Sequence, residues 1–190
     1  AIAYTAAPFH LVNVYVRGDS LAEFWAMAFY PLVLLTGERL LDADRRGLNR
    51  ILLFALAYAG LIISHNVSAM IFSPFLLLYL GWRWLGFDGD RRGLALRLTG
   101  GLLLALALSA WFWLPALGET GLAQTGPITA GYFHYSAHFR DLDQVQPDLL
   151  FDFDVAGGGA FRMGLLQLLL AAAGAGAWFW AGRRERLSWL

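Results

Sequence analysis

The sequence predicts an all-α fold, namely a fragment of a polytopic membrane protein with about five transmembrane helices. Composition is the first observation: 58% of the 190 residues are hydrophobic and only 15% are charged, whereas about 25% is usual in soluble domains. The second is that the apolar residues form long runs, and runs of about 18 or more are typical of membrane spans. These runs cover residues 21–37, 51–84, 98–117 and 164–181.

The arginine distribution is the third observation, because it gives each span a direction. All fourteen basic residues are arginine, and eleven of them fall in segments 38–50, 83–97 and 183–186. Cytoplasmic loops carry the excess of basic residues, so we expect all three segments inside the cell. The run 51–84 must then cross twice, because both of its flanks are basic. We expect a tight hairpin that turns at Ser64, His65 and Asn66.

The resulting topology is one membrane domain over residues 1–190. Its spans lie at 21–37, 48–64, 67–83, 96–114 and 163–182, and an extracytoplasmic loop covers 115–162. The external parts hold eight acidic residues against three arginines, a net charge of minus five. We expect a multi-pass protein of the plasma (inner) membrane. The chain begins with Ala and shows no signal peptide, so we also expect it to be part of a longer protein.

Two charged residues flank the start of the first span. Arg17 is a candidate phosphate-binding residue, because a guanidinium donates paired hydrogen bonds to phosphate oxygens; the alternative is contact with a lipid headgroup. Glu23 is a candidate catalytic acid. Ser20-x-x-Glu23 also matches a capping box, in which Glu23 bonds the backbone of Ser20.

Polar residues at the hairpin turn and after the fourth span are further candidates. His65 and Asn66 are candidate substrate-binding residues, because polar groups at membrane depth are costly and usually line a cavity; the alternative is a simple turn. Pro115 is expected to end the fourth span. Glu119 follows it as a second candidate catalytic carboxylate, the alternative being a surface acid.

The external loop contains a possible metal site. His134 and His138 are four residues apart and can share a helix face, and Asp141 and Asp143 can add oxygen ligands for Mn²⁺ or Mg²⁺. The alternative is an interfacial helix over 132–139. With no cysteine in the chain, disulfides and thiolate metal sites are excluded. The zero net charge gives no indication of a nucleic-acid partner.

Three segments resemble a known family: PFHLVNVYVRGDSLAEFWAMAFYPLVLL, LIISHNVSAMIFSPFLLL and LSAWFWLPALGE. They resemble bacterial membrane proteins called 6-pyruvoyl-tetrahydropterin synthase-related, a name that implies no pterin chemistry. That family is similar in plan to GT-C glycosyltransferases, which use polyprenyl-phosphate sugars at the outer membrane face. The resemblance covers roughly residues 4–155, and R-G-x-x-x-x-E and S-H-N are its most specific parts. GT-C enzymes usually place a catalytic acid in an earlier external loop, before the part seen here.

The resemblance implies a membrane glycosyltransferase that acts on a lipid-linked sugar. Arg17 would bind the phosphate, while His65, Asn66 and Glu119 would line a shared external cavity. The alternative is a non-catalytic membrane module that binds or moves a lipid. A carboxylate facing a cavity near Arg17 would favour the enzyme, and a capped or lipid-facing carboxylate would favour the module.

Overall fold

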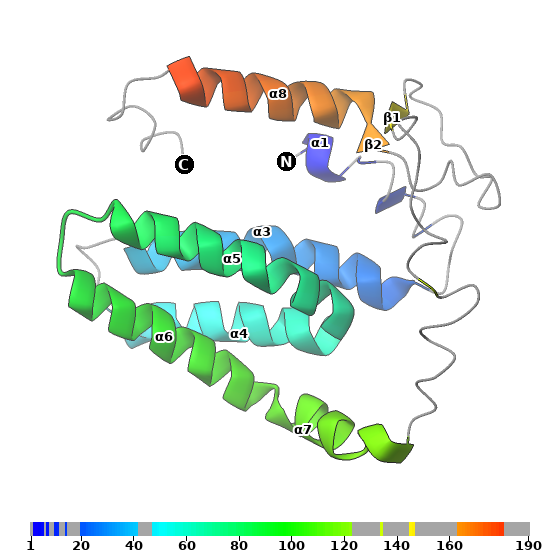
Figure 1. Ribbon diagram of the computed structural model, residues 1–190, viewed down its shortest axis with the longest axis vertical. Coiled ribbons are helices and arrows are strands. Elements are labelled where there is room, and N and C mark those ends of the chain that lie inside the picture. Colours follow the sequence, from blue (N-terminus) through cyan, green and yellow to red (C-terminus); the bar gives the residue numbers. More distant parts are fainter. Residues whose placement is uncertain are drawn as a thin grey trace. The chain divides into compact units, whose positions relative to one another are not determined.

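The computed structural model describes residues 2–5, 7, 10–11, 14, 20–41, 47–122, 134, 145–146 and 163–180. This part of the chain is mostly helical, as the sequence predicts. It divides into two compact units (Figure 1). Unit 1 comprises Ala1–Ser20 and Tyr132–Leu190, and unit 2 comprises Leu21–Gly131.

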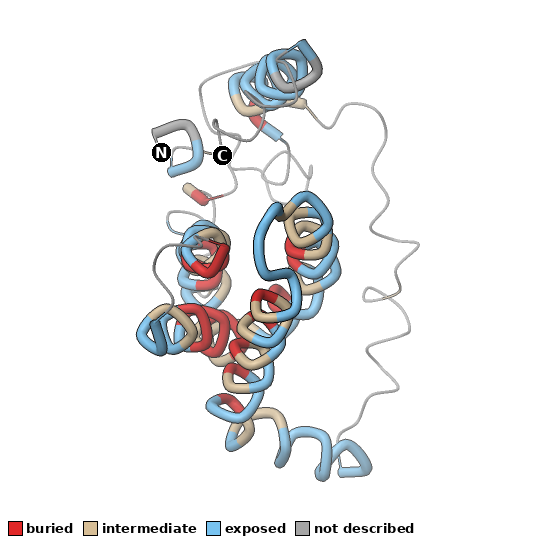
Figure 2. Tube along the Cα trace, turned by 90° about the vertical axis from the view of Figure 1, so that its left-hand side faces the viewer, coloured by how far each residue is buried: buried red, intermediate tan, exposed pale blue. Residues whose placement is uncertain are grey.

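Unit 2 is an antiparallel helical bundle (Figure 1). Its elements are α3 (Leu21–Leu41), α4 (Leu48–Ser64), α5 (Asn66–Leu85), α6 (Arg91–Leu108), α7 (Ala110–Gly118) and the 3₁₀ helix η1 (Thr120–Leu122). Helix α4 packs mainly against α3 and α6, and α5 packs against α3 and α4. Buried residues are concentrated along α3, α4, α5 and α6 (Figure 2). Helix α4 is therefore the centre of the bundle.

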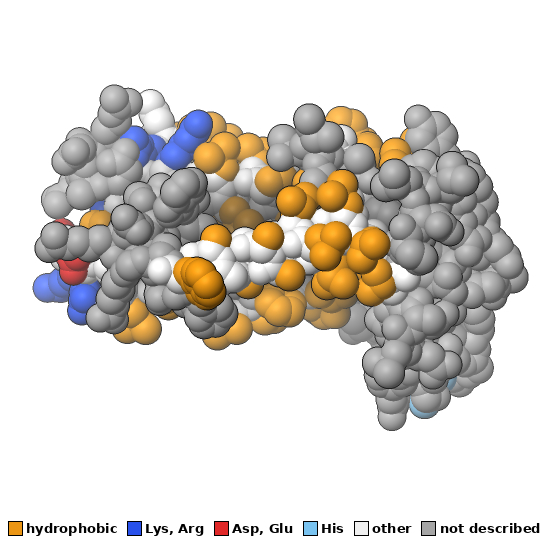
Figure 3. All heavy atoms as spheres, turned by 90° about the horizontal axis from the view of Figure 1, so that it is seen from above, with side chains coloured by type: hydrophobic (Ala, Val, Ile, Leu, Met, Phe, Trp, Pro, Cys, Tyr) orange, Lys and Arg blue, Asp and Glu red, His pale blue; other side chains and the backbone are white. Residues whose placement is uncertain are grey.

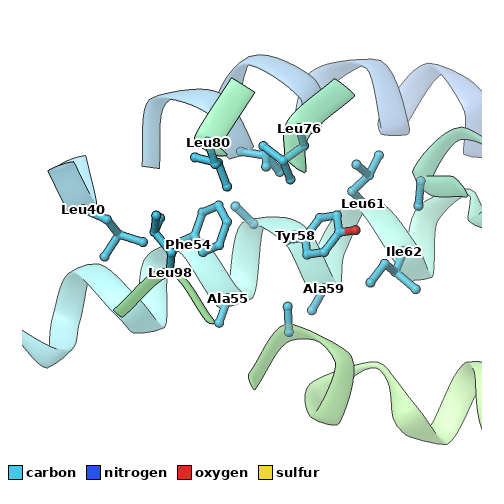
Figure 4. Packing of buried hydrophobic residues seen from close by; sticks show 14 of the residues in the cluster. Leu40, Phe54, Ala55, Tyr58, Ala59, Leu61, Ile62, Leu76, Leu80 and Leu98 are labelled. Carbon is cyan, nitrogen blue, oxygen red and sulfur yellow. The ribbon is translucent and has the colours of Figure 1, made fainter. Parts of the chain in front are cut away.

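Aromatic rings packed on glycines bring the helices close together. The fully buried ring of Phe54 lies among leucines from α3, α5 and α6 (Figure 4). A Cβ added at Gly101 of α6 would lie 2.7 Å from the Phe54 ring. A Cβ added at Gly60 of α4 would clash with the ring of Phe29 on α3. The absence of a side chain at both positions therefore sets the spacing of α4 from its neighbours.

The hairpin predicted within residues 51–84 is present. Helix α4 ends at Ser64, α5 begins at Asn66, and His65 between them has an extended backbone. The hydroxyl of Tyr58 lies 2.5 Å from that of Ser73 and joins the two arms. The turn therefore lies where the sequence predicts it, while its orientation to a membrane stays a prediction.

The fourth predicted span, 96–114, contains a break that the sequence did not predict. Helix α6 ends at Leu108, and α7 follows at an angle of 64°. The buried Ser109 stabilises the break, because its hydroxyl donates to the carbonyls of Ala105 (2.9 Å) and Leu106 (3.3 Å). The expectation that Pro115 ends the helix is wrong, since α7 continues to Gly118.

Membrane-crossing capacity is unequal among the described helices. By length and composition, α5 qualifies on its own, and α6 with α7 qualifies if the bent pair is one span. Helices α4 and α8 are apolar but shorter. Helix α3 carries three charged residues, Glu23, Glu38 and Arg39. A multi-pass arrangement with five spans therefore stays a prediction.

Unit 1 has few described elements. They are α1 (Ile2–Thr5), β1 (Val145–Gln146), β2 (Met163–Gly164) and α8 (Leu165–Trp180). The two short strands pair in parallel, with Val145 opposite Met163. Helix α8 begins directly after β2 and occupies most of the predicted final span, 163–182.

Candidate functional site

The two ends of unit 2 differ in chemistry. We call one end the arginine end; it carries Arg39, Arg50, Arg83, Arg91 and Arg92 where α3 and α5 finish and α4 and α6 begin. We call the opposite end the His65 end; it carries the candidate residues Glu23, His65, Asn66 and Glu119. Figure 3 shows arginine and acidic side chains gathered at one end of the view.

The imidazole of His65 forms the N-terminal cap of α5. Its Nδ1 accepts the backbone N–H of Ser68 at 3.2 Å and lies 2.8 Å from the Ser68 hydroxyl. A neutral imidazole has one donor and one acceptor nitrogen. Since Nδ1 accepts, the ring proton resides on Nε2, and Nε2–H is the donor that His65 can offer to a ligand.

Asn66 has a similar division of roles. Its Oδ1 accepts the backbone N–H of Val67 at 2.9 Å, while the residue itself is exposed at the start of α5. The side-chain amide N–H groups are then the part that can serve a ligand. His65 and Asn66 are adjacent in sequence, and together they present hydrogen-bond donors, the groups that phosphate and sugar oxygens require.

The two candidate carboxylates have different surroundings. Glu23 is half-buried in the first turn of α3, where a negative charge stabilises the helix dipole. Glu119 is exposed and caps the C-terminus of α7 through its backbone, whose N–H donates to Pro115 at 2.9 Å. A carboxylate gains no helix-dipole stabilisation at a C-terminus. Helix electrostatics therefore accounts for Glu23 and leaves Glu119 as the better candidate for chemistry.

Several predicted site residues lie outside the described residues: Arg17, His138, Asp141 and Asp143. His134 is described and is partly buried. Within the described ranges, no three His, Asp or Glu side chains are grouped as a metal ion requires. The Mn²⁺ or Mg²⁺ site therefore stays a prediction. So does a cavity shared by Arg17, His65 and Glu119, although unit 2 brings the last two to one end.

A buried polar network at the arginine end was not anticipated from the sequence. The Glu38 carboxylate accepts from the Tyr79 hydroxyl and from the Arg83 guanidinium, each at 2.6 Å. The side chains of Arg83 and Glu38 are only 15% and 20% exposed. The sequence predicts Glu38 and Arg83 on the same side of the membrane, but it does not show that α3 lies beside α5. The network joins these two helices.

The loop between α5 and α6 is held by its own charged residues. Arg91 donates to the carbonyls of Leu85 (3.0 Å) and Phe87 (2.9 Å), which caps the C-terminus of α5. Asp90 accepts the backbone N–H of Gly93 at 2.9 Å, which caps the N-terminus of α6. These contacts turn the chain tightly at the arginine end and so set the antiparallel order of the two helices.

His10 is the buried histidine of unit 1. Its ring meets the ring of Tyr4 edge-on, with centroids 4.6 Å apart. Burial lowers the pKa of His10, and hydrogen bonds to the backbone of Thr5 and Tyr4 oppose that shift. The net effect favours the neutral imidazole, which is the expected form of a histidine that packs in a core.

Comparison with known proteins does not assign the chain to a family. No family model, curated protein or solved structure matches the chain. The family resemblance in the three segments therefore stays an expectation from the sequence.

Proposed function

We propose that this chain is the membrane domain of a GT-C-like glycosyltransferase that acts on a polyprenyl-phosphate-linked sugar at the extracytoplasmic face. One observation carries the proposal. The His65 end presents the His65 and Asn66 donors and the Glu119 carboxylate, at the opposite end of the bundle from the arginines.

The arginine asymmetry sets the orientation in this proposal. The cytoplasmic side of a membrane protein holds the excess of Lys and Arg near the span ends. The arginine end would then face the cytoplasm, and the His65 end would face outward. Apolar side chains are exposed along α5 and α6 between the two ends, as lipid contact requires. This arrangement supports a multi-pass protein of the plasma (inner) membrane.

Each candidate residue then has a role in the transfer. The acceptor hydroxyl attacks the anomeric carbon, the bond from that carbon to the phosphate oxygen breaks, and polyprenyl phosphate leaves. Glu119, or Glu23 as the second candidate, takes the hydroxyl proton. Nε2–H of His65, the amide of Asn66 and the guanidinium of Arg17 stabilise the charge on the leaving phosphate. The predicted metal at His134, His138, Asp141 and Asp143 would assist the same step.

Release of polyprenyl phosphate by the purified protein in lipid nanodiscs tests the proposal. With a polyprenyl-phosphate hexose as donor, and with glycerol or water to supply the acceptor hydroxyl, we expect time-dependent release. Glu119→Gln should slow it by about 100-fold or more, the usual contribution of a general base. His65→Ala should slow it by about 100-fold as well, as the loss of a charge-stabilising donor does. Asp88→Asn, an exposed acid at the arginine end, is the control and should leave the rate unchanged.

A second candidate is a module that binds or moves a lipid without chemistry. The exposure of Glu119 favours it, because general bases usually work in sites shielded from water. The same variants separate the candidates. If wild-type protein binds polyprenyl phosphate, releases no product, and loses binding only in His65→Ala, then the module is correct and the enzyme is not.

A further inference from the structure

Helix α7 exposes an apolar surface, apart from the side on which Phe112 and Trp113 pack against the bundle core. Its sequence AWFWLPALG contains no charged residue, and none of its nine residues is buried. Trp111, Leu114 and Leu117 are 68%, 53% and 62% exposed. A helix on a water-facing surface normally has one polar face. Water is therefore an unfavourable neighbour for the exposed surface of α7.

The bend before α7 is stabilised by internal hydrogen bonds. The Ser109 hydroxyl bonds two carbonyls of the last turn of α6. The indole N–H of Trp113 donates to the Leu106 carbonyl at 3.0 Å. These bonds supply partners for backbone groups at the break, as non-helical backbone at membrane depth requires. The indole N–H of Trp113, the only donor of that side chain, is therefore paired.

Helix lengths show how a bent α7 fits a bilayer. The 18 residues of α6 extend about 27 Å at a rise of about 1.5 Å per residue, close to the hydrocarbon thickness of about 30 Å. Counted from Arg91, α6 therefore nearly reaches the opposite boundary by itself. Arg97 then lies about 9 Å along the helix, and its side chain, which donates to the Gly93 carbonyl one turn back, reaches toward the arginine end. With the 64° bend, the nine residues of α7 add only about 6 Å along the axis of α6. Glu119, the first charged residue after α7, then emerges in the headgroup region.

We propose that α6 and α7 form one broken span in which α7 lies at a shallow angle in the leaflet on the His65 side, packed against lipid acyl chains. The proposal rests on the membrane embedding that the proposed function assumes, but not on catalysis. Exposed leucines of α6, among them Leu103 and Leu106, lead directly into the exposed residues of α7. The lipid-facing surface is therefore continuous through the bend. The tryptophans of α7 fit the interfacial region, where tryptophan is enriched.

Spin-label depth measurements test this proposal. The chain has no cysteine, so single cysteines at Trp111, Leu114 and Leu117 can be labelled in the full protein in liposomes. Relative accessibility to oxygen and to a water-soluble nickel complex gives the depth of each label. We expect all three labels to lie in lipid, with a depth difference of about 4 Å from position 111 to position 117, given the bend. Labels at Met70 and Leu78 of α5, both exposed, are the control and should differ by about 12 Å.

Two outcomes would overturn the inference. A depth difference near 9 Å along α7, the full rise of an upright helix, would show that the span is straight in the bilayer. High nickel accessibility at Leu114 and Leu117 would show that α7 lies in water, and these two labels suffice if Trp111→Cys fails to fold. Neither result depends on catalysis, so a protein without transferase activity but with α7 in lipid would refute only the proposed function.

Discussion

Helices α4 and α5 are both apolar and form two arms of one hairpin, yet they have different surroundings. Helix α4 has seven buried residues among 17, while α5 has four among 20. Small residues explain the contrast, because Ala55, Ala59 and Gly60 let α3 and α6 approach α4. Helix α5 instead exposes large side chains such as Phe75 and Leu78. Apolar character alone thus does not distinguish a helix in a protein core from one that faces its surroundings.

Replacing one phenylalanine on each arm by alanine should give the largest difference in the free energy of unfolding. Phe54 of α4 is 0% exposed and Phe75 of α5 is 66% exposed. Phe54→Ala opens a cavity and should lower the free energy of unfolding by about 3–5 kcal/mol. Phe75→Ala should change it by less than about 1 kcal/mol, because most of that ring contacts no other residue. Unfolding in mixed micelles measures both; equal losses would show that the two arms are packed alike.

Two adjacent glycines of α6, Gly100 and Gly101, test how tightly α6 packs against α4. Gly101→Ala places a Cβ 2.7 Å from the Phe54 ring, whereas the Gly100 position has open space. We expect Gly101→Ala to destabilise by about 1–3 kcal/mol through overpacking. Gly100→Ala should be neutral or stabilise by up to about 1 kcal/mol, because alanine favours helix. Thermal unfolding of the two variants measures both effects. If Gly101→Ala is as stable as the unsubstituted protein, α6 does not pack tightly against α4.

The hydrogen bond between the arms should contribute less. Tyr58→Phe removes the donor that meets Ser73 at 2.5 Å, while Ser73 still has the Ala69 carbonyl. The expected loss is about 1 kcal/mol, typical of one buried hydrogen bond. A double-mutant cycle with Ser73→Ala isolates the pair. A coupling energy of zero would show that the two hydroxyls do not interact.

A smaller effect is expected from pH, and it lies in unit 1. Since burial lowers the pKa of His10 in the folded chain, the unfolded chain binds a proton first as the pH falls. Stability should therefore be complete well above pH 6.5, the ordinary value, and decrease as acidification passes through it. The melting temperature at pH 7.5 and 5.5 measures the loss. His10→Gln should reduce this pH dependence, and an unchanged dependence would contradict the assignment.

Local polar patterns in the sequence predict some parts of this structure well. The hairpin turn was predictable because Ser64, His65 and Asn66 interrupt an apolar run between two arginine-rich flanks. The break at Ser109 was not predictable, because apolar residues continue on both sides and one serine is common within a helix. Its effect depends on hydrogen bonds to its own backbone.

The position of His65 at the hairpin turn was predictable from the sequence, but its hydrogen bonding was not. The sequence pointed to His65, but only the contact with Ser68 shows which ring nitrogen remains a donor. The contact of Glu38 with Tyr79 and Arg83 was not predicted, because it depends on α3 lying beside α5. Pairing between distant segments is a property of the packed bundle, and hydropathy along the chain does not contain it.

The proposed orientation places the arginine end in the cytoplasm and the His65 end outside the cell. Cysteine labelling tests it directly, because the chain has no native cysteine. Asp88 and Gly121 are exposed positions at the arginine end and just beyond α7. In sealed cells, a membrane-impermeant maleimide should label Gly121→Cys but not Asp88→Cys, and permeabilised cells should label both. Labelling of Asp88→Cys in sealed cells would contradict the proposed orientation of the bundle.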